Sequence, residues 1–255
     1  LLRDHKEEFG LFFISDFKID QKTIYERPFD FEKLLRLSMN LKRRVLLVDS
    51  TNISSSTLET PSEMDLIPVF DELFQSTENR IFITCFSSNI HRLMTFISLA
   101  KKHGRRIIPH GRSMISYLNT ANELGMIPDY NNIVKMAESI TPNQENIVVL
   151  LSGCQGDFRG TFRRFCVGED STFKPRPEDL VLLSSKDIPG NEKKIALLVN
   201  RISEVGAKVI TAQDRLIHVS GHPGKKDLSF LYDKYNPTDI VPSHGESYFI
   251  RAHIE

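Results

Sequence analysis

The sequence has few cysteines, no tryptophan and no net charge. Cys85, Cys154 and Cys166 show no CxxC spacing, which argues against a disulfide framework and favours a reducing, cytosolic setting. Lysine plus arginine and aspartate plus glutamate number 33 each, so nucleic-acid binding would need a local basic patch rather than global charge. No apolar run approaches the ~20 residues that span a membrane, which excludes a membrane helix as an interpretation of this sequence.

Strand-like and helix-like segments alternate through the middle of the chain. Continuous apolar runs at residues 81–85, 146–151 and 180–184 indicate buried strands, and each is followed by a segment of helical periodicity. This alternation is typical of a parallel sheet with helices on both faces. We therefore predict a doubly wound α/β unit over residues 53–210.

Two further buried strands are predicted before this unit, at residues 11–14 and 45–48. Asp16 and Asp49 follow them closely. Each carboxylate is a candidate metal ligand or general base, and the alternative for each is an ordinary capping or turn aspartate. The residues themselves leave both interpretations open.

Serine and glycine follow the carboxyl ends of most strands of the predicted unit, where open α/β sheets bind ligands. Loops of this kind expose backbone N–H groups that suit phosphate, although ordinary turns have the same composition. Their occurrence at one sheet edge favours an anion-binding cleft. The segments are residues 87–89, 110–113, 152–156 and 184–185.

Histidine, serine and glycine cluster twice near the C-terminus, as HVSGH at residues 218–222 and PSHGE at residues 242–246. Imidazole binds transition metals and transfers protons near neutral pH, and glycine lets the backbone turn tightly beside it. A catalytic zinc site needs about three protein ligands, and a two-metal site roughly twice as many. The chain contains no HxHxDH segment, so these residues alone do not complete a metal site.

A series of short segments resembles, in its order, the bacterial ribonuclease J family, of the β-CASP branch of the metallo-β-lactamase superfamily. The segments are DFKID (16–20), DSTN (49–52), SNIHR (88–92), GRSM (111–114), GCQG (153–156), IPGNE (188–192), HVSGH (218–222) and HGE (244–246). Any one of them is weak evidence, but the ordered set covers nearly the whole chain and is highly specific.

The resemblance implies roles for the matching positions. Asp16 would bridge two zinc ions, and His244 would be a terminal zinc ligand. Asp49 and His222 would lie at the catalytic centre, where His222 would assist departure of the leaving oxygen. Two zinc ions are expected in the complete enzyme.

The resemblance also implies a substrate and a reaction. His218 and Ser220 would hold a phosphate of RNA, preferably 5′-monophosphorylated RNA. A metal-bound hydroxide would hydrolyse phosphodiesters in RNA processing and decay, both endonucleolytically and from 5′ to 3′. The protein would be cytoplasmic, without a membrane partner, and at least homodimeric.

The expected fold is α/β: a β-CASP doubly wound parallel-sheet domain over residues 53–210, inserted in an incomplete metallo-β-lactamase αββα sandwich made of residues 1–52 and 211–255. Ser15, Cys154 and Asp157 stand where the family usually has glycine, serine and glutamate, which are conservative changes. The family's HxHxDH motif and C-terminal domain would lie outside this chain, so we expect the chain alone to be inactive.

Two alternatives carry different functions. The chain could be a non-catalytic RNA-binding or assembly module that has lost its metal half, although retention of Asp16, His222 and His244 counts against this. A hydrolase of small molecules fits the superfamily, but an α/β insertion with serine-glycine loops is better suited to a polyanion.

Overall fold

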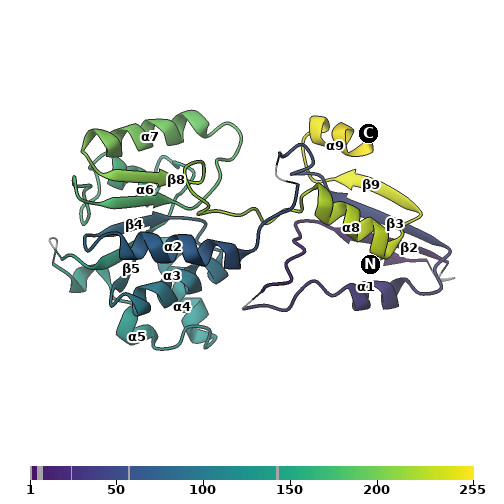
Figure 1. The fold of residues 1–255 in the computed structure, drawn as a ribbon, viewed down its shortest axis with the longest axis horizontal. Coiled ribbons are helices and arrows are strands. Elements are labelled where there is room, and N and C mark those ends of the chain that lie inside the picture. The colour runs from purple at the N-terminus through teal and green to yellow at the C-terminus, as the bar shows by residue number, and fades with distance from the viewer. Residues whose placement is uncertain (1, 5–7, 24, 57, 142–143) are drawn as a thin grey trace. The chain divides into compact units, whose positions relative to one another are not determined.

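The chain folds into two compact units in a computed structural model (Figure 1). Unit 1 comprises residues 1–64 and 219–255, and unit 2 comprises residues 65–218. The sequence interpretation places the corresponding boundaries after residues 52 and 210. The structure describes residues 2–4, 8–23, 25–56, 58–141 and 144–255.

Unit 2 contains, among the described residues, a five-stranded sheet in the order β5-β6-β4-β7-β8. All its strand pairs are parallel, so each connection must cross over, and helices provide these crossovers. Every residue of β4, β6 and β7 is buried, which explains why their sequences are continuously apolar. The strands are β4 (Ile81–Thr84), β5 (Arg106–His110), β6 (Ile147–Leu151), β7 (Leu180–Leu183) and β8 (Lys208–Thr211).

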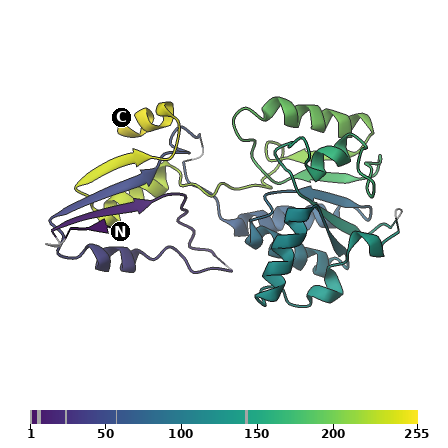
Figure 2. The same ribbon diagram turned by 180° about the vertical axis from the view of Figure 1, so that it is seen from behind.

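Helices cover both faces of this sheet, with α6 and α7 on one face and α2, α3 and α4 on the other (Figures 1 and 2). Phe82 and Val149 of the sheet, Phe165 of α6 and Ile202 of α7 belong to one buried apolar cluster. The predicted doubly wound α/β unit is therefore confirmed. The helices are α2 (Ile67–Gln75), α3 (Ile90–Lys102), α4 (Arg112–Glu123), α5 (Tyr130–Ile133), α6 (Thr161–Cys166) and α7 (Glu192–Glu204), with short 3₁₀ turns η1 (Glu63–Leu66) and η2 (Ala137–Ser139).

Unit 1 contains, within the described ranges, a four-stranded sheet in the order β1-β2-β3-β9. β1 runs antiparallel to β2, whereas β2, β3 and β9 are parallel. Its strands are β1 (Leu2–Arg3), β2 (Phe9–Ile14), β3 (Arg43–Asp49) and β9 (Asp239–Ser243), and its helices are α1 (Phe31–Ser38), α8 (Lys225–Tyr235) and α9 (Ser247–Ile254).

The core of unit 1 lies on one face of its sheet. Phe12, Leu46 and Val48 pack there with Leu231 and Tyr235 of α8. The prediction that the strand at residues 11–14 is wholly buried is wrong, because Phe13 is 62 % exposed. Successive side chains of a strand point to opposite faces, so Phe12 enters this core while Phe13 points away from it.

Within the part of the chain that the structure describes, none of the helices has both the length and the apolar character that crossing a bilayer would require.

A buried carboxylate, Asp170, ties the end of β5 to the loop after α6. Its Oδ1 accepts hydrogen bonds from the backbone N–H groups of Thr172 (2.9 Å) and Phe173 (3.0 Å), and His110 Nε2 lies 3.0 Å from both carboxylate oxygens. Burial alone would raise the pKa of Asp170, but the hydrogen bonds from His110 and the backbone outweigh it and lower the pKa to about 2.

We predict that Asp170→Asn destabilises the protein at neutral pH. The folded-state pKa lies below the ordinary value of 3.8, so this stabilisation is present above pH ~4 and is lost as the pH falls towards about 2. The variant should lose about 2 kcal/mol of unfolding free energy at pH 7. Urea unfolding at pH 7, 4 and 3 measures this, with exposed Glu123→Gln as control. If Asp170→Asn lost as much unfolding free energy at pH 3 as at pH 7, this explanation would be contradicted.

Candidate metal centre and catalytic site

Four of the predicted site residues meet at one edge of the sheet of unit 1. Asp49 ends β3, Asp16 follows β2 and His244 follows β9. Because these strands are parallel neighbours, their carboxyl ends lie together. His222 reaches the same place from the loop before α8. Each of the four offers one ligand atom, and these atoms all lie within 4.8 Å of one another.

Asp49 is the buried member of this group, with no exposed surface. Its Oδ2 lies 2.6 Å from His222 Nδ1, and its Oδ1 accepts hydrogen bonds from Thr51 N (2.8 Å) and Thr51 Oγ1 (2.6 Å). Burial on its own would raise the pKa of Asp49, but the hydrogen bonds from His222 and Thr51 outweigh it and lower the pKa. Asp49 is therefore an ionised carboxylate whose oxygens are held in fixed directions.

His222 is positioned through both its ring and its backbone. The ring uses Nδ1 towards Asp49, so a proton exchanged with a substrate would pass through Nε2. Its backbone N–H donates to Ser220 Oγ (3.1 Å). Its carbonyl oxygen accepts from Asn52 Nδ2 (3.1 Å) and Thr60 Oγ1 (2.8 Å). A histidine backed by a buried carboxylate is a common arrangement for general acid–base chemistry.

His244 has a left-handed backbone, with φ of 51°. This conformation is uncommon for a residue other than glycine and persists where surrounding contacts enforce it. The His244 carbonyl oxygen accepts hydrogen bonds from Ser50 N (3.2 Å) and Thr51 Oγ1 (3.3 Å). The ring lies over that of His222, with centroids 5.4 Å apart, and its Nδ1 is 3.3 Å from Asp16 Oδ1 and 3.4 Å from Asp49 Oδ1.

The donor set fits a divalent transition metal. Two carboxylates and two imidazoles are ligand types that zinc accepts. Asp49 is buried whereas Asp16 and His244 are exposed, so the group has a supported side and an open side. Thr51 Oγ1 contacts Asp49 Oδ1 and His244 Nδ1 (3.2 Å), and outer hydrogen bonds of this kind orient metal ligands.

The two predicted phosphate-binding residues lie in different units. Ser220 belongs to unit 1, and its hydroxyl oxygen accepts hydrogen bonds from Asn52 Nδ2 (2.9 Å) and His222 N (3.1 Å). His218 belongs to unit 2, where its Nδ1 lies 2.8 Å from Arg92 Nη1. Ser220 thus supports the loop that carries His222, and His218 is held by α3.

Three residues of the site were not selected from the sequence. Thr51 and Asn52 fall in the DSTN segment, and the position of that segment directly after a buried strand is a signal that could have identified them. Thr60, whose hydroxyl bonds the His222 carbonyl, follows a serine-rich loop and has no comparable signal.

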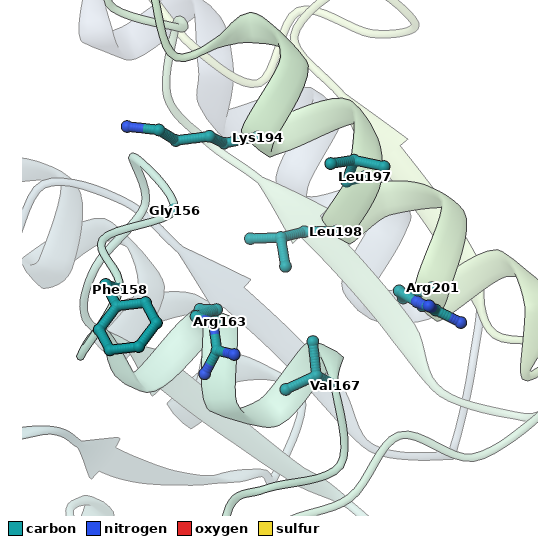
Figure 3. A pocket seen from close by; sticks show the side chains of 8 residues that line it. All are labelled: Gly156, Phe158, Arg163, Val167, Lys194, Leu197, Leu198 and Arg201. Atoms are coloured by element: carbon teal, nitrogen blue, oxygen red, sulfur yellow. The ribbon is translucent and has the colours of Figure 1, made fainter.

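A separate cavity of about 420 Å³ lies between α6 and α7 of unit 2 (Figure 3). Phe158, Arg163, Lys194 and Arg201 are among the residues that line it. Arg163 pairs with Glu169 (2.6 Å) and Arg201 with Glu204 (3.2 Å). Because acidic partners offset its two guanidinium groups and its lining includes none of the predicted catalytic residues, this cavity does not compete with the edge of unit 1 as the reactive site.

The serine and glycine loops of unit 2 pack closely. A Cβ atom at Gly111, where φ is 106°, would collide with the hydroxyl groups of Ser152 and Thr161, so only glycine fits there. Ser87 Oγ and Ser113 Oγ lie 3.2 Å apart. Binding of an anion by these loops stays a prediction.

Comparisons with known proteins match two family models to residues 78–255 of the chain. A family model described as "Ribonuclease J, beta-CASP domain" matches residues 78–202. A second, described as "Zn-dependent metallo-hydrolase RNA specificity domain", matches residues 199–255. The chain thus contains a ribonuclease J β-CASP domain followed by a metallo-hydrolase RNA specificity domain. The resemblance predicted from the ordered segments and the expected β-CASP fold are thereby confirmed.

Curated relatives named ribonuclease J agree with these matches. The protein of Mycolicibacterium smegmatis is 34% identical over 239 residues, which is 93% of this chain and 42% of that protein. The Helicobacter pylori protein is 34% identical over 94% of this chain and 34% of its own length. The Synechocystis protein is 35% identical over 94% of this chain and 37% of its own length. The chain thus spans 34% to 42% of the length of these relatives.

We predict that the purified chain binds one zinc ion at this group. Asp16→Ala and His244→Ala should each weaken zinc binding at least about tenfold, because even an outer partner of a ligand contributes that much. Thr51→Val should weaken zinc binding about tenfold, because it removes the hydroxyl group that orients Asp49 and His244. Competition with a chromophoric chelator measures the dissociation constants.

The matched control is His103→Ala, because His103 pairs with Asp71 in unit 2. Equal zinc affinity in all variants would mean that zinc binds elsewhere.

Proposed function

We propose that this chain is part of a zinc-dependent ribonuclease that hydrolyses phosphodiester bonds in RNA processing and decay. The observation that carries the proposal is the convergence of Asp16, Asp49, His222 and His244 within 4.8 Å. This group lies in a chain whose two family models name a ribonuclease and a zinc-dependent RNA specificity domain.

Asp16 and His244 are the proposed zinc ligands, from the two exposed positions of the group. When bound, zinc would supply Lewis-acid activation of water and would offset negative charge on the phosphate. The buried Asp49 would keep both histidine rings in place, since its carboxylate oxygens contact each of them. Complete relatives are expected to hold two ions.

His222 is the proposed proton donor to the leaving oxygen of the RNA. Its Nδ1 faces the ionised Asp49, which favours a protonated ring and fixes its orientation. The proton would leave from Nε2 and pass to the oxygen released when the P–O bond breaks. Asp49 and His222 would thus act together, with Asp49 orienting the acid.

Ser220 and His218 are the proposed residues that hold an RNA phosphate, with 5′-monophosphorylated RNA as the preferred substrate. A hydroxyl and an imidazole are both suited to donate to phosphate oxygens. Endonucleolytic and 5′-to-3′ exonucleolytic cleavage, a homodimeric or larger assembly and a cytoplasmic location complete the proposal.

We further propose that this chain alone has little or no hydrolytic activity. Its described residues provide one group of four possible ligands, whereas a two-metal site needs roughly six. One zinc ion can still bind to this group, so we expect this chain to bind zinc without hydrolysing RNA.

The test uses the purified chain with zinc and two labelled RNAs of one sequence, one with a 5′-monophosphate and one with a 5′-hydroxyl. We expect tighter binding of the monophosphorylated RNA, a loss of about fivefold in Ser220→Ala from a missing hydrogen bond, and no cleavage. Fluorescence anisotropy measures binding, and gel analysis of the RNA measures cleavage.

His103→Ala again serves as the control and should bind like the unmodified chain. Zinc-dependent cleavage that Asp16→Ala or His244→Ala abolishes would overturn the proposed inactivity. Binding of neither RNA would count against the ribonuclease assignment. Tight RNA binding without any zinc binding would favour a non-catalytic RNA-binding module.

A further inference from the structure

Arg92 is an almost fully buried cation in unit 2, only 1% exposed. It lies in the first turn of α3, where the Asn89 side chain caps the helix by accepting a hydrogen bond from Arg92 N (3.1 Å). The cap fixes the backbone from which the Arg92 side chain extends. A buried arginine requires hydrogen-bond acceptors for its N–H groups. The acceptors of Arg92 among the described residues therefore indicate which segments of unit 2 it connects.

The Arg92 guanidinium joins α3 to the residue that follows β7 and to the segment before residue 219. Its Nη1 lies 3.0 Å from the Ser184 carbonyl oxygen, 3.4 Å from Ser184 Oγ and 2.8 Å from His218 Nδ1. The Ser184 hydroxyl donates to the Ile217 carbonyl oxygen (2.6 Å). Ser184 thus fixes the residue before His218, while Arg92 contacts the His218 ring.

The chemistry of this contact determines where the imidazole carries its proton. A guanidinium group has only donors and stays protonated in proteins. His218 Nδ1 must therefore accept the hydrogen bond, which places the proton of the neutral ring on Nε2. Protonating Nδ1 as well would break the bond and put a second positive charge beside a buried one.

We propose that Arg92 is a positioning residue that holds His218 as the neutral, Nε2-protonated tautomer. His218, which is half-buried, would then present the same hydrogen-bond donor to an RNA phosphate throughout the neutral pH range. The phosphate part rests on the function proposed above. Arg92 of α3 is a charged group in contact with the ring, and Ser184, which follows β7 and contacts the same guanidinium, is uncharged.

This arrangement is unlike that of His222, whose Nδ1 faces the carboxylate of Asp49. A carboxylate favours a protonated ring, whereas a guanidinium favours a neutral one. The two histidines of the HVSGH segment would therefore have opposite duties: His222 transfers a proton, and His218 donates a hydrogen bond without titrating.

The test is nitrogen NMR of the full 255-residue chain labelled at histidine, with His218 assigned from the spectrum of His218→Ala. We expect His218 to carry its proton on Nε2 between pH 5.5 and 8. In Arg92→Met, which removes the donor, the ring should titrate at higher pH and lose its single tautomer. Arg92→Lys, which keeps a donor, should restore the unmodified behaviour at least in part.

A proton on Nδ1 in the unmodified chain would overturn the proposal without any variant, so a failure of Arg92→Met to fold does not protect it. The same titration in the unmodified chain and in folded Arg92→Met would also overturn it.

RNA binding separates this inference from the proposed function. Affinity for a 5′-monophosphorylated oligonucleotide is measured at pH 5.5 and 7.5 for the unmodified chain, Arg92→Met and His218→Ala. For each protein, the affinity at pH 5.5 is divided by the affinity at pH 7.5. This ratio should be about fivefold larger for Arg92→Met than for His218→Ala, because a charged donor binds phosphate more strongly than a neutral one. The unmodified chain should have the same ratio as His218→Ala.

Equal affinity of His218→Ala and the unmodified chain would overturn the phosphate-binding role of His218. The tautomer would still be decided by the NMR measurement.

Discussion

The ionised carboxylate of Asp49 is the constraint around which the site of unit 1 is organised. A fully buried charge is costly unless hydrogen bonds surround it. Asp49 obtains them from Thr51 and from His222, so the need to stabilise one charge fixes the positions of its neighbours. His244 also lies within 3.4 Å. Removing the charge would therefore disturb the turn after β3 and both histidines at once.

Parallel strand pairing brings together residues that are far apart in the sequence. Asp49 of β3 pairs with Ser243 of β9, and His244 follows Ser243 directly, with its Nδ1 3.4 Å from Asp49 Oδ1. Asp49 is the last residue of its strand and His244 follows the end of its own, so both side chains lie at the carboxyl edge of the sheet, where they can converge. The chemistry thus depends on backbone pairing as much as on the identities of the four side chains.

The sequence predicts more of unit 2 than of unit 1. Strands such as β6 are apolar throughout because both faces are covered, and this gives a clear signal. In β2, apolar residues occur on both faces, so the sequence does not reveal that Phe13 is exposed while Phe12 is buried. The four converging site residues were identified through ordered segments. The contact of Arg92 with His218 was not, because it depends on a helix cap and a strand end that are distant in the sequence.

The discontinuity of unit 1 has a consequence for how the chain reaches its folded state. Unit 2 is contiguous, whereas unit 1 needs residues from both sides of it. During synthesis from the N-terminus, unit 2 can fold while β3 still lacks its partner β9, because domains generally fold as units once their residues are available. Pairing β3 with β9 requires closing the long stretch of chain between them. Once unit 2 has folded, much of that stretch is a compact body rather than a flexible loop. The group of Asp16, Asp49, His222 and His244 can therefore form only after β9 has been made and has paired with β3.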